Sequence, residues 1–183
     1  REKVPDIRYI LGGKGPDRSR LEGLIDQLEL KENVTLAGYV SDAELCDHYN
    51  LCHLFAMPSK GEGFGIVFLE AMACGKPVLA GNDDGSVDAL RDGELAVLGD
   101  PDNREELSEA SSASLEEVER RRGKGGRRKS EVGSQKQMIP DARSALRIPS
   151  IVFQPEELRE KVIEHFGFEK FKQRLAAILE PLL

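Results

Sequence analysis

The sequence predicts an α/β fold in which a parallel β-sheet carries helices on both faces. Three observations support this prediction. Short apolar runs alternate with helical patterns from residue 6 to about residue 107, and glycine or proline marks the joins between them. Strands that alternate with helices pair in parallel through right-handed crossovers. Such sheets bind ligands beyond the carboxyl ends of their strands, and the glycines of this chain follow its apolar runs.

Five short apolar runs predict the strands. They lie at 6–11, 34–37, 54–58, 77–80 and 95–98. Between the first two, apolar residues recur with the i, i+3, i+4, i+7 spacing that is typical of one face of a helix. They are Leu21, Leu24, Ile25 and Leu28. We expect Asp17 to cap the start of this helix.

The other helices are predicted from the signals at their ends. Ser41, with Glu44 three residues later, is a capping box that predicts a helix over 42–50. The apolar helix 66–73 is expected to end at Gly75, which occupies the position that favours glycine after a helix. Ser86 is expected to cap a short helix, and Asn103 to start another. A helix is expected from Pro155 to Gly167, and a last amphipathic helix from Phe168 onward.

The composition divides the chain into three parts. Residues 1–110 form the α/β lobe, residues 111–150 a basic, low-complexity linker or insertion, and residues 151–183 C-terminal helices that pack on the lobe. Within the linker, the window 120–129 holds seven Lys and Arg residues and no acidic residue. No aromatic residue interrupts that window, which favours a solvated linker. Binding of nucleic acid or of an anionic membrane surface is the alternative.

The overall composition excludes several classes of protein. The chain of 183 residues has a net charge of −7, which argues against a general nucleic-acid-binding protein. No apolar run approaches the length that spans a bilayer, and the N-terminus has no hydrophobic leader, so we expect neither an integral membrane protein nor a secreted one. Three cysteines are too few for a disulfide scaffold. We therefore expect a cytoplasmic protein.

The segment from Glu62 to Glu70 carries the most chemical information. Gly63 and Gly65 let a ligand approach the backbone, and the helix behind them offers unpaired N–H groups to a phosphate. That helix is apolar except for Glu70, so we expect it to be buried. A buried carboxylate needs donors, and the hydroxyls of a sugar or ribose are suitable. Glu62 and Glu70 thus frame a site that suits a nucleotide sugar.

Further motifs surround this segment in a defined order. They are Gly13-Lys14-Gly15-Pro16, Gly38-Tyr39-Val40, Ala71-Met72-Ala73-Cys74-Gly75-Lys76-Pro77-Val78, Asp92-Gly93 and Asp100-Pro101-Asp102. Together with Glu62 and Glu70, spaced as E-x7-E, they resemble the C-terminal, donor-binding lobe of family-4 GT-B retaining glycosyltransferases. The resemblance covers about 7–107 and implies a single GT-B lobe with a Rossmann-like parallel sheet.

The resemblance implies a role for each residue that matches the family's motifs. The donor-binding residues would be Gly13, Lys14, Val40, Glu62, Gly63, Phe64, Gly65, Ile66 and Glu70. Glu62 would be the catalytic-site residue that contacts the donor sugar, Glu70 would accept hydrogen bonds from the ribose, and Val40 would meet the base. Backbone N–H groups after Gly63 would hold the sugar and the distal phosphate. The resemblance implies no metal in the site and no cofactor, because the nucleoside-diphosphate sugar is the substrate.

The family pattern also includes parts that we do not find in these residues. An acceptor-binding N-terminal lobe and an Arg/Lys pair are absent from the 183 residues. We therefore expect the isolated chain to bind the donor without transferring a hexose at a useful rate, whether it is a fragment, a truncated product or half of a split enzyme. The base, the sugar and the acceptor stay open.

Other interpretations also stay open. The chain could be a non-catalytic interaction module derived from such a lobe, or another GT-B relative, such as a sugar-nucleotide epimerase or a phosphorylase-like enzyme. The turn around Gly13 could be a plain strand-to-helix connection. Two cysteines and two histidines match no usual zinc spacing, so we expect no metal site there. They are Cys46, His48, Cys52 and His53.

Overall fold

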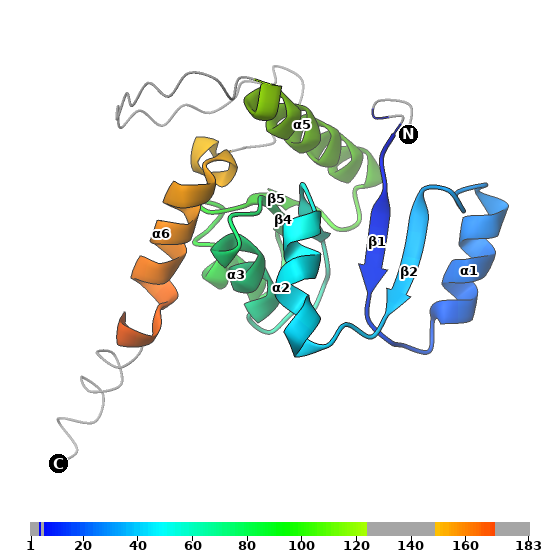
Figure 1. Cartoon of the computed structure of the whole chain (residues 1–183), viewed down its shortest axis with the longest axis horizontal. Helices are drawn as coiled ribbons and strands as arrows, with labels where there is room; N and C mark the ends of the chain where they lie inside the picture. The colour runs from blue at the N-terminus through cyan, green and yellow to red at the C-terminus, as the bar shows by residue number, and fades with distance from the viewer. Residues whose placement is uncertain (1–3, 5, 124–148, 171–183) are drawn as a thin grey trace, which may run out of the picture. The chain divides into compact units, whose positions relative to one another are not determined.

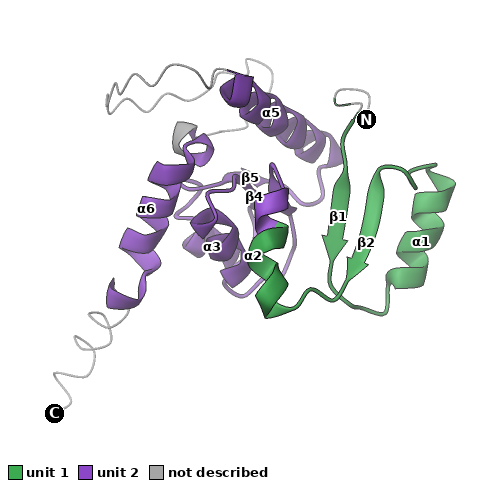
Figure 2. Ribbon diagram, in the orientation of Figure 1, with its two compact units in different colours: residues 1–48 green, residues 49–183 purple. Residues whose placement is uncertain are grey.

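The computed structural model describes Val4, residues 6–123 and residues 149–170. It consists of two compact units, residues 1–48 and 49–183, which we describe separately (Figure 2). The described residues contain five strands, close to the five predicted positions, and each strand pair is parallel. The predicted α/β fold with parallel strands is therefore confirmed.

Unit 1 is a two-stranded parallel unit joined by a helix (Figure 1). It contains β1 (Tyr9–Gly12), α1 (Arg18–Gln27), β2 (Val34–Gly38) and the larger part of α2 (Asp42–Leu51). Tyr9 pairs with Val34. The side-chain amide of Asn33, just before β2, donates to the Ile7 carbonyl at 2.8 Å. This bond connects the residues that precede β1 and β2.

The two helix starts of unit 1 differ in how they are capped. Asp17 occupies the predicted N-cap of α1, but its side chain makes no cap hydrogen bond. The Arg20 guanidinium donates to it at 2.7 Å instead, because a charged donor competes well with a backbone amide. At α2 the Glu44 carboxylate accepts a hydrogen bond from the Ser41 hydroxyl at 2.6 Å, and the predicted helix is present.

Unit 2 holds a three-stranded parallel sheet in the order β3-β4-β5. Its elements are β3 (Phe55–Met57), α3 (Ile66–Ala73), β4 (Val78–Gly81), α4 (Ser86–Ala89), β5 (Val97–Gly99), α5 (Arg104–Gly123), the 3-10 turn η1 (Ser150–Phe153) and α6 (Pro155–Phe166). Phe55 pairs with Val78, and Leu79 pairs with Val97. Since the strands are parallel, the loops that follow β3 and β4 leave the same edge of the sheet.

The core of unit 2 joins the sheet to α5 and η1. Its central cluster is Leu79, Val97, Ala110, Val152 and Phe153, all buried. At the sheet, β4 is buried along its whole length. Because two residues of this cluster come from η1, the segment after residue 148 is an integral part of the core.

Helix α5 is longer than the sequence predicts. It continues through Gly123, into the segment 111–150 that we expected to be a linker. Ala110 and Ser114 are fully buried, and Leu107 and Val118 pack against the core cluster, so the packed face holds small side chains between larger apolar ones. Ion pairs from Glu117 to the following arginines support the last turns. The expectation of a linker is therefore wrong as far as Gly123, and residues 124–148 lie outside the described part.

Helix α6 packs along α3 (Figure 1). It begins at Pro155 and ends at Phe166, with Gly167 following it as predicted, and Leu158 and Val162 on it are buried. Gly75 follows α3 with a φ of +69°, which confirms the expected glycine there, and a Cβ on it would lie 2.8 Å from Pro155. Residues 168–170 are helical, and the rest of the helix expected from Phe168 lies outside the described residues.

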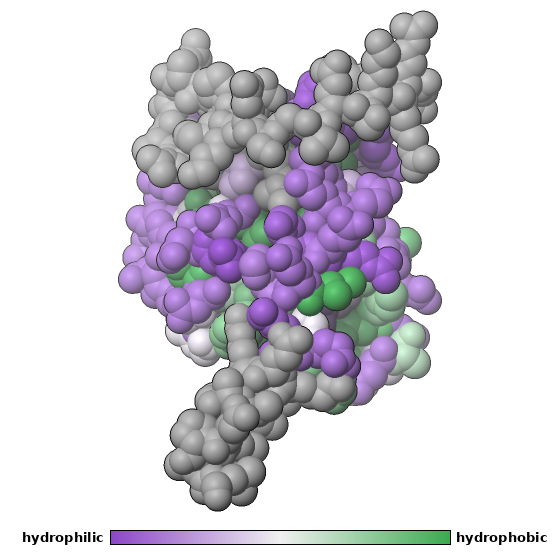
Figure 3. Space-filling view, turned by 90° about the vertical axis from the view of Figure 1, so that its left-hand side faces the viewer, coloured by the Kyte–Doolittle hydropathy of each residue, from purple (hydrophilic) through white to green (hydrophobic). Residues whose placement is uncertain are grey.

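The surface of unit 2 on the side of α6 is mostly hydrophilic, with separate hydrophobic patches (Figure 3). Ile163 on α6 is one of the exposed apolar residues. Across the described residues, every helix falls short of the length or the apolar character that crossing a bilayer requires.

Candidate functional site

The start of α3 is shaped by Gly65. This residue is the N-cap of α3 and has a φ of +78°, in the left-handed region that favours glycine. A Cβ on it would lie 2.4 Å from the Phe68 ring. The Phe68 N–H donates to the Gly65 carbonyl at 3.0 Å, whereas the N–H groups of Ile66 and Val67 have no backbone acceptor among the described residues. The helix therefore begins with free donors, as an anion site requires.

Helix α3 is buried on one side only. Phe68, Ala71 and Met72 are fully buried, but Ile66 is 64% exposed. The expectation of a helix buried on all sides is therefore wrong at its first turn. The exposed first turn leaves the free N–H groups accessible to a ligand.

Asp84, in the loop after β4, holds the loop before α3. One carboxylate oxygen accepts the Glu62 N–H at 3.0 Å, and the other accepts the Ser86 N–H at 2.9 Å. The Ser86 hydroxyl, followed by these amides, keeps the pKa of the Asp84 carboxyl below its usual value. We expected Ser86 to cap α4. The structure corrects this, since Gly85 is the N-cap residue and Asp84 supplies the acceptor.

Gly85 allows the two loops to touch. A Cβ on Gly85 would lie only 1.9 Å from the Gly63 carbonyl oxygen, so no other residue fits without moving the loop. The Gly85 N–H also donates to the Glu62 carbonyl at 3.0 Å. Gly63 itself has open space where its Cβ would be. The glycine that the loop contact requires is thus Gly85, which the sequence analysis did not single out.

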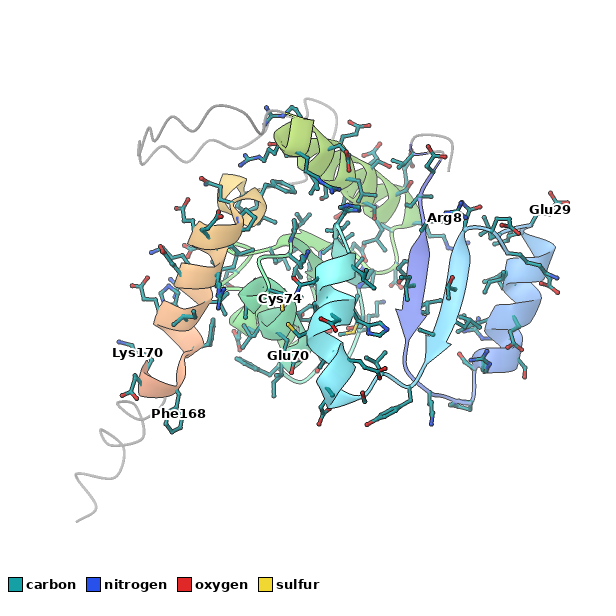
Figure 4. All side chains as sticks on the ribbon, viewed as in Figure 1. Arg8, Glu29, Glu70, Cys74, Phe168 and Lys170 are labelled. Atoms are coloured by element: carbon teal, nitrogen blue, oxygen red, sulfur yellow. The ribbon has the colours of Figure 1, made fainter. Side chains whose placement is uncertain are left out.

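The two predicted carboxylates have different surroundings. The Glu62 side chain is half-buried and accepts the Gly63 N–H at 3.1 Å. Glu70 lies on α3 (Figure 4). Its carboxylate accepts a hydrogen bond from the Tyr49 hydroxyl at 2.8 Å. Burial, and then this bond, raises the pKa of the Tyr49 phenol. A carboxylate has lone pairs for several donors, so Glu70 is oriented by Tyr49 and can still accept from a ligand.

Phe64 connects the loop to α6. Its ring is 41% exposed and meets the Phe166 ring edge to face, with centroids 6.1 Å apart. The predicted residues thus form one continuous loop and helix start, and Asp84 and Gly85 contact this loop at Glu62 and Gly63. They are Glu62, Gly63, Phe64, Gly65 and Ile66. Glu70 follows one turn into the same helix.

The remaining predicted residues belong to unit 1. Gly13 follows β1 with a φ of +126°, and its N–H donates to the Gly38 carbonyl at 2.6 Å. Lys14 lies with its ammonium 5.1 Å from the centre of the Tyr39 ring. Gly13 and Lys14 line a cavity of about 510 Å³ at the carboxyl ends of β1 and β2. Val40 lies beside this turn, since a Cβ on Gly12 would lie 3.4 Å from the Val40 side chain.

In the described ranges, no cluster of three or more His, Cys, Asp or Glu side chains is suited to a metal ion. His53, which belongs to no usual zinc-binding pattern, contacts Arg122.

Comparison with known proteins gives one family. The sequence pattern of the family "Glycosyl transferases group 1" matches residues 1–129. A GDP-mannose-dependent alpha-(1-6)-phosphatidylinositol monomannoside mannosyltransferase of Mycolicibacterium smegmatis is 35% identical over 107 residues, which cover 55% of this chain and 28% of that protein. A D-inositol 3-phosphate glycosyltransferase of Mycobacterium sp. strain KMS is 39% identical over 104 residues, covering 54% of this chain and 24% of that protein. The chain spans about a quarter of the length of these curated relatives.

Solved structures show the same fold. The crystal structure of Anabaena HepE in complex with UDP and glucose matches with a TM-score of 0.69 at 21% identity, over 97% of this chain and 41% of that one. The fold is thus the Rossmann-like lobe of a GT-B protein, as the sequence predicted. Because the family pattern matches residues 1–129, which are most of this chain, the chain belongs to the glycosyl transferases group 1 family.

Proposed function

We propose that this chain is the donor-binding lobe of a retaining glycosyltransferase that takes a hexose from a nucleoside-diphosphate sugar. The observation that carries the proposal is the start of α3, where free N–H groups at Ile66 and Val67 follow a loop that Asp84 and Gly85 hold in place. Membership of the family and the UDP complexes of structural neighbours support it.

The chemistry follows from charge. A leaving nucleoside diphosphate gains negative charge, and the N-terminal end of α3 carries partial positive charge from its aligned peptide dipoles. A donor group that is already held in position stabilises this charge without reorganising during the reaction. The contacts of Asp84 and Gly85 with the loop provide such positioning, and no metal is needed in this scheme.

The carboxylates provide the hydroxyl contacts. Glu62 would accept hydrogen bonds from the donor sugar, and Glu70, oriented by Tyr49, would accept from the ribose. In unit 1, the cavity beside Gly13 and Lys14 would by itself accept an anionic group, with the Lys14 ammonium as its cation. Assayed alone, the chain is expected to bind the donor without transferring the sugar at a useful rate.

A calorimetric titration of the chain with UDP, GDP and ADP tests the proposal. At least one nucleotide should bind, and Glu70→Gln should weaken it by about 1–3 kcal/mol, or roughly fivefold to 150-fold, as for a lost hydrogen bond to a charged group. Glu116→Gln is the matched control, since Glu116 is exposed on α5. A folded sample that binds none of the three nucleotides would refute the proposal.

A further inference from the structure

Unit 2 contains a cavity of its own, at the end of the three-stranded sheet where β3 and β4 begin. It has a volume of about 420 Å³ and is lined by residues just before β3 and β4, together with the end of α5 and η1. His53 precedes β3, and Lys76 precedes β4. The loop before α3 follows β3. Since the strands are parallel, this cavity and the proposed donor site are at opposite edges of the sheet.

The charges around this cavity do not balance. Glu117 on α5 is buried and pairs with both Arg120 and Arg121, so it offsets part of their charge. Lys76 donates to the Asn50 carbonyl at 2.9 Å and has no carboxylate partner among the described residues.

Arg122 is also weakly compensated. It reaches Glu119 at 3.4 Å, and both side chains are about 60% or more exposed, so the pair contributes little. Its guanidinium also meets the Nε2 atom of His53, which must act as the acceptor because a guanidinium only donates. Among the described residues, Lys76 and Arg122 are thus two cations of this cavity without a strong anionic partner.

Part of the remaining lining is apolar. The Phe153 ring is 5% exposed, and the Arg121 guanidinium lies 5.7 Å from its centroid and donates to its carbonyl at 3.2 Å. Pro77 and Val118 add further apolar surface. A volume of this size, with apolar walls and a few polar groups, is typical of a site for a small organic molecule.

We propose that this cavity binds a phosphate ester, with the phosphate on Lys76 and Arg122 and the organic part against Phe153 and Pro77. The charge imbalance selects an anion, and Arg and Lys side chains are the usual partners of phosphate. The ester is either a soluble metabolite or the headgroup of a phospholipid. The site is independent of the donor site, and the proposal does not rest on the proposed function.

The test is a titration of the full chain, with and without added UDP, with two probes in separate arms. One arm uses glycerol 3-phosphate, and the other uses vesicles of phosphatidylcholine with and without phosphatidylglycerol. The variant Lys76→Gln/Arg122→Gln is compared with Arg159→Gln/Lys161→Gln, which removes the same charge from the exposed surface of α6. Thermal melting checks that both variants fold.

We expect at least one probe to bind the unmodified chain and the α6 control equally, and to bind the cavity variant at least about tenfold more weakly, since two charge-assisted contacts are removed. Binding of glycerol 3-phosphate indicates a soluble ester. Binding only of vesicles that contain phosphatidylglycerol indicates a lipid headgroup. The proposal is overturned if neither probe binds or if the cavity variant and the control bind equally.

Discussion

Replacing Gly85 with alanine tests whether contact between two loops fixes the start of α3. The added Cβ would lie 1.9 Å from the Gly63 carbonyl oxygen. Carbon–oxygen contacts in proteins are about 3.3 Å or longer, so the loops must separate by more than about 1 Å. That separation breaks two hydrogen bonds of 3.0 Å, from the Gly85 N–H to the Glu62 carbonyl and from the Glu62 N–H to Asp84.

The expected loss of stability follows from these two bonds. Each contributes about 1 kcal/mol net, so Gly85→Ala should lower the free energy of unfolding by about 2 kcal/mol. For a chain of this size, 1 kcal/mol changes Tm by about 2–4 °C, which predicts a decrease of about 4–8 °C. Displacing the amides at the start of α3 by 1 Å should also weaken nucleotide binding by roughly tenfold or more.

Thermal denaturation followed by circular dichroism measures the first effect. Gly63→Ala is the matched control, because it lies in the same loop and its Cβ would meet open space. Its unfolding free energy should stay within about 0.5 kcal/mol of the unmodified chain. If Gly85→Ala melts at the same temperature as Gly63→Ala, the loop contact does not stabilise the fold and the reasoning is wrong.

Three further predictions concern the same unit. In urea unfolding, Gly65→Ala should lower the free energy of unfolding more than Gly61→Ala does. Both glycines have a positive φ, but only a Cβ on Gly65 would meet the Phe68 ring. Equal losses of unfolding free energy would contradict the Phe68 contact. Tyr49→Phe should cost about 1 kcal/mol of unfolding free energy through the lost bond to Glu70, and an unchanged urea midpoint would argue against that bond. Arg120, and then Arg121, holds the pKa of Glu117 below its usual value. The ionised carboxylate therefore stabilises the fold at neutral pH, and this contribution is lost as the pH falls through the pKa of Glu117 in the folded chain. The Tm difference between the unmodified chain and Glu117→Gln should thus shrink below about pH 4. A difference that stays constant with pH would contradict the ion pairs.

The elements that sequence analysis predicted correctly have local signals. Gly75 after α3 and Pro155 at the start of α6 mark helix ends within a few residues of the pattern that they close. Glu70 was singled out because it interrupts an apolar helix. In each case the physical cause lies within about one helical turn, so neighbouring residues in the sequence reveal it.

The features that sequence analysis missed depend on contacts between distant segments. Asp84 and Glu62 are 22 residues apart, and Tyr49 and Glu70 are 21 apart, so no periodic pattern connects them. The extension of α5 was missed for another reason. The fully buried centre of its packed face is Ala110 and Ser114, with Leu107 and Val118 at either end, and small buried side chains such as these give only a weak amphipathic pattern in the sequence.

The contribution of η1 and α6 to the fold has a practical consequence for protein production. The family pattern stops at residue 129, yet Val152 and Phe153 complete the core and Leu158 and Val162 cover α3. A shortened version cut at residue 129 would lack these four residues and leave the apolar side chains that they cover, in the core cluster and on α3, in contact with water. It should therefore self-associate during purification. Boundaries for crystallography or NMR therefore belong after Gly167, well beyond the end suggested by family similarity.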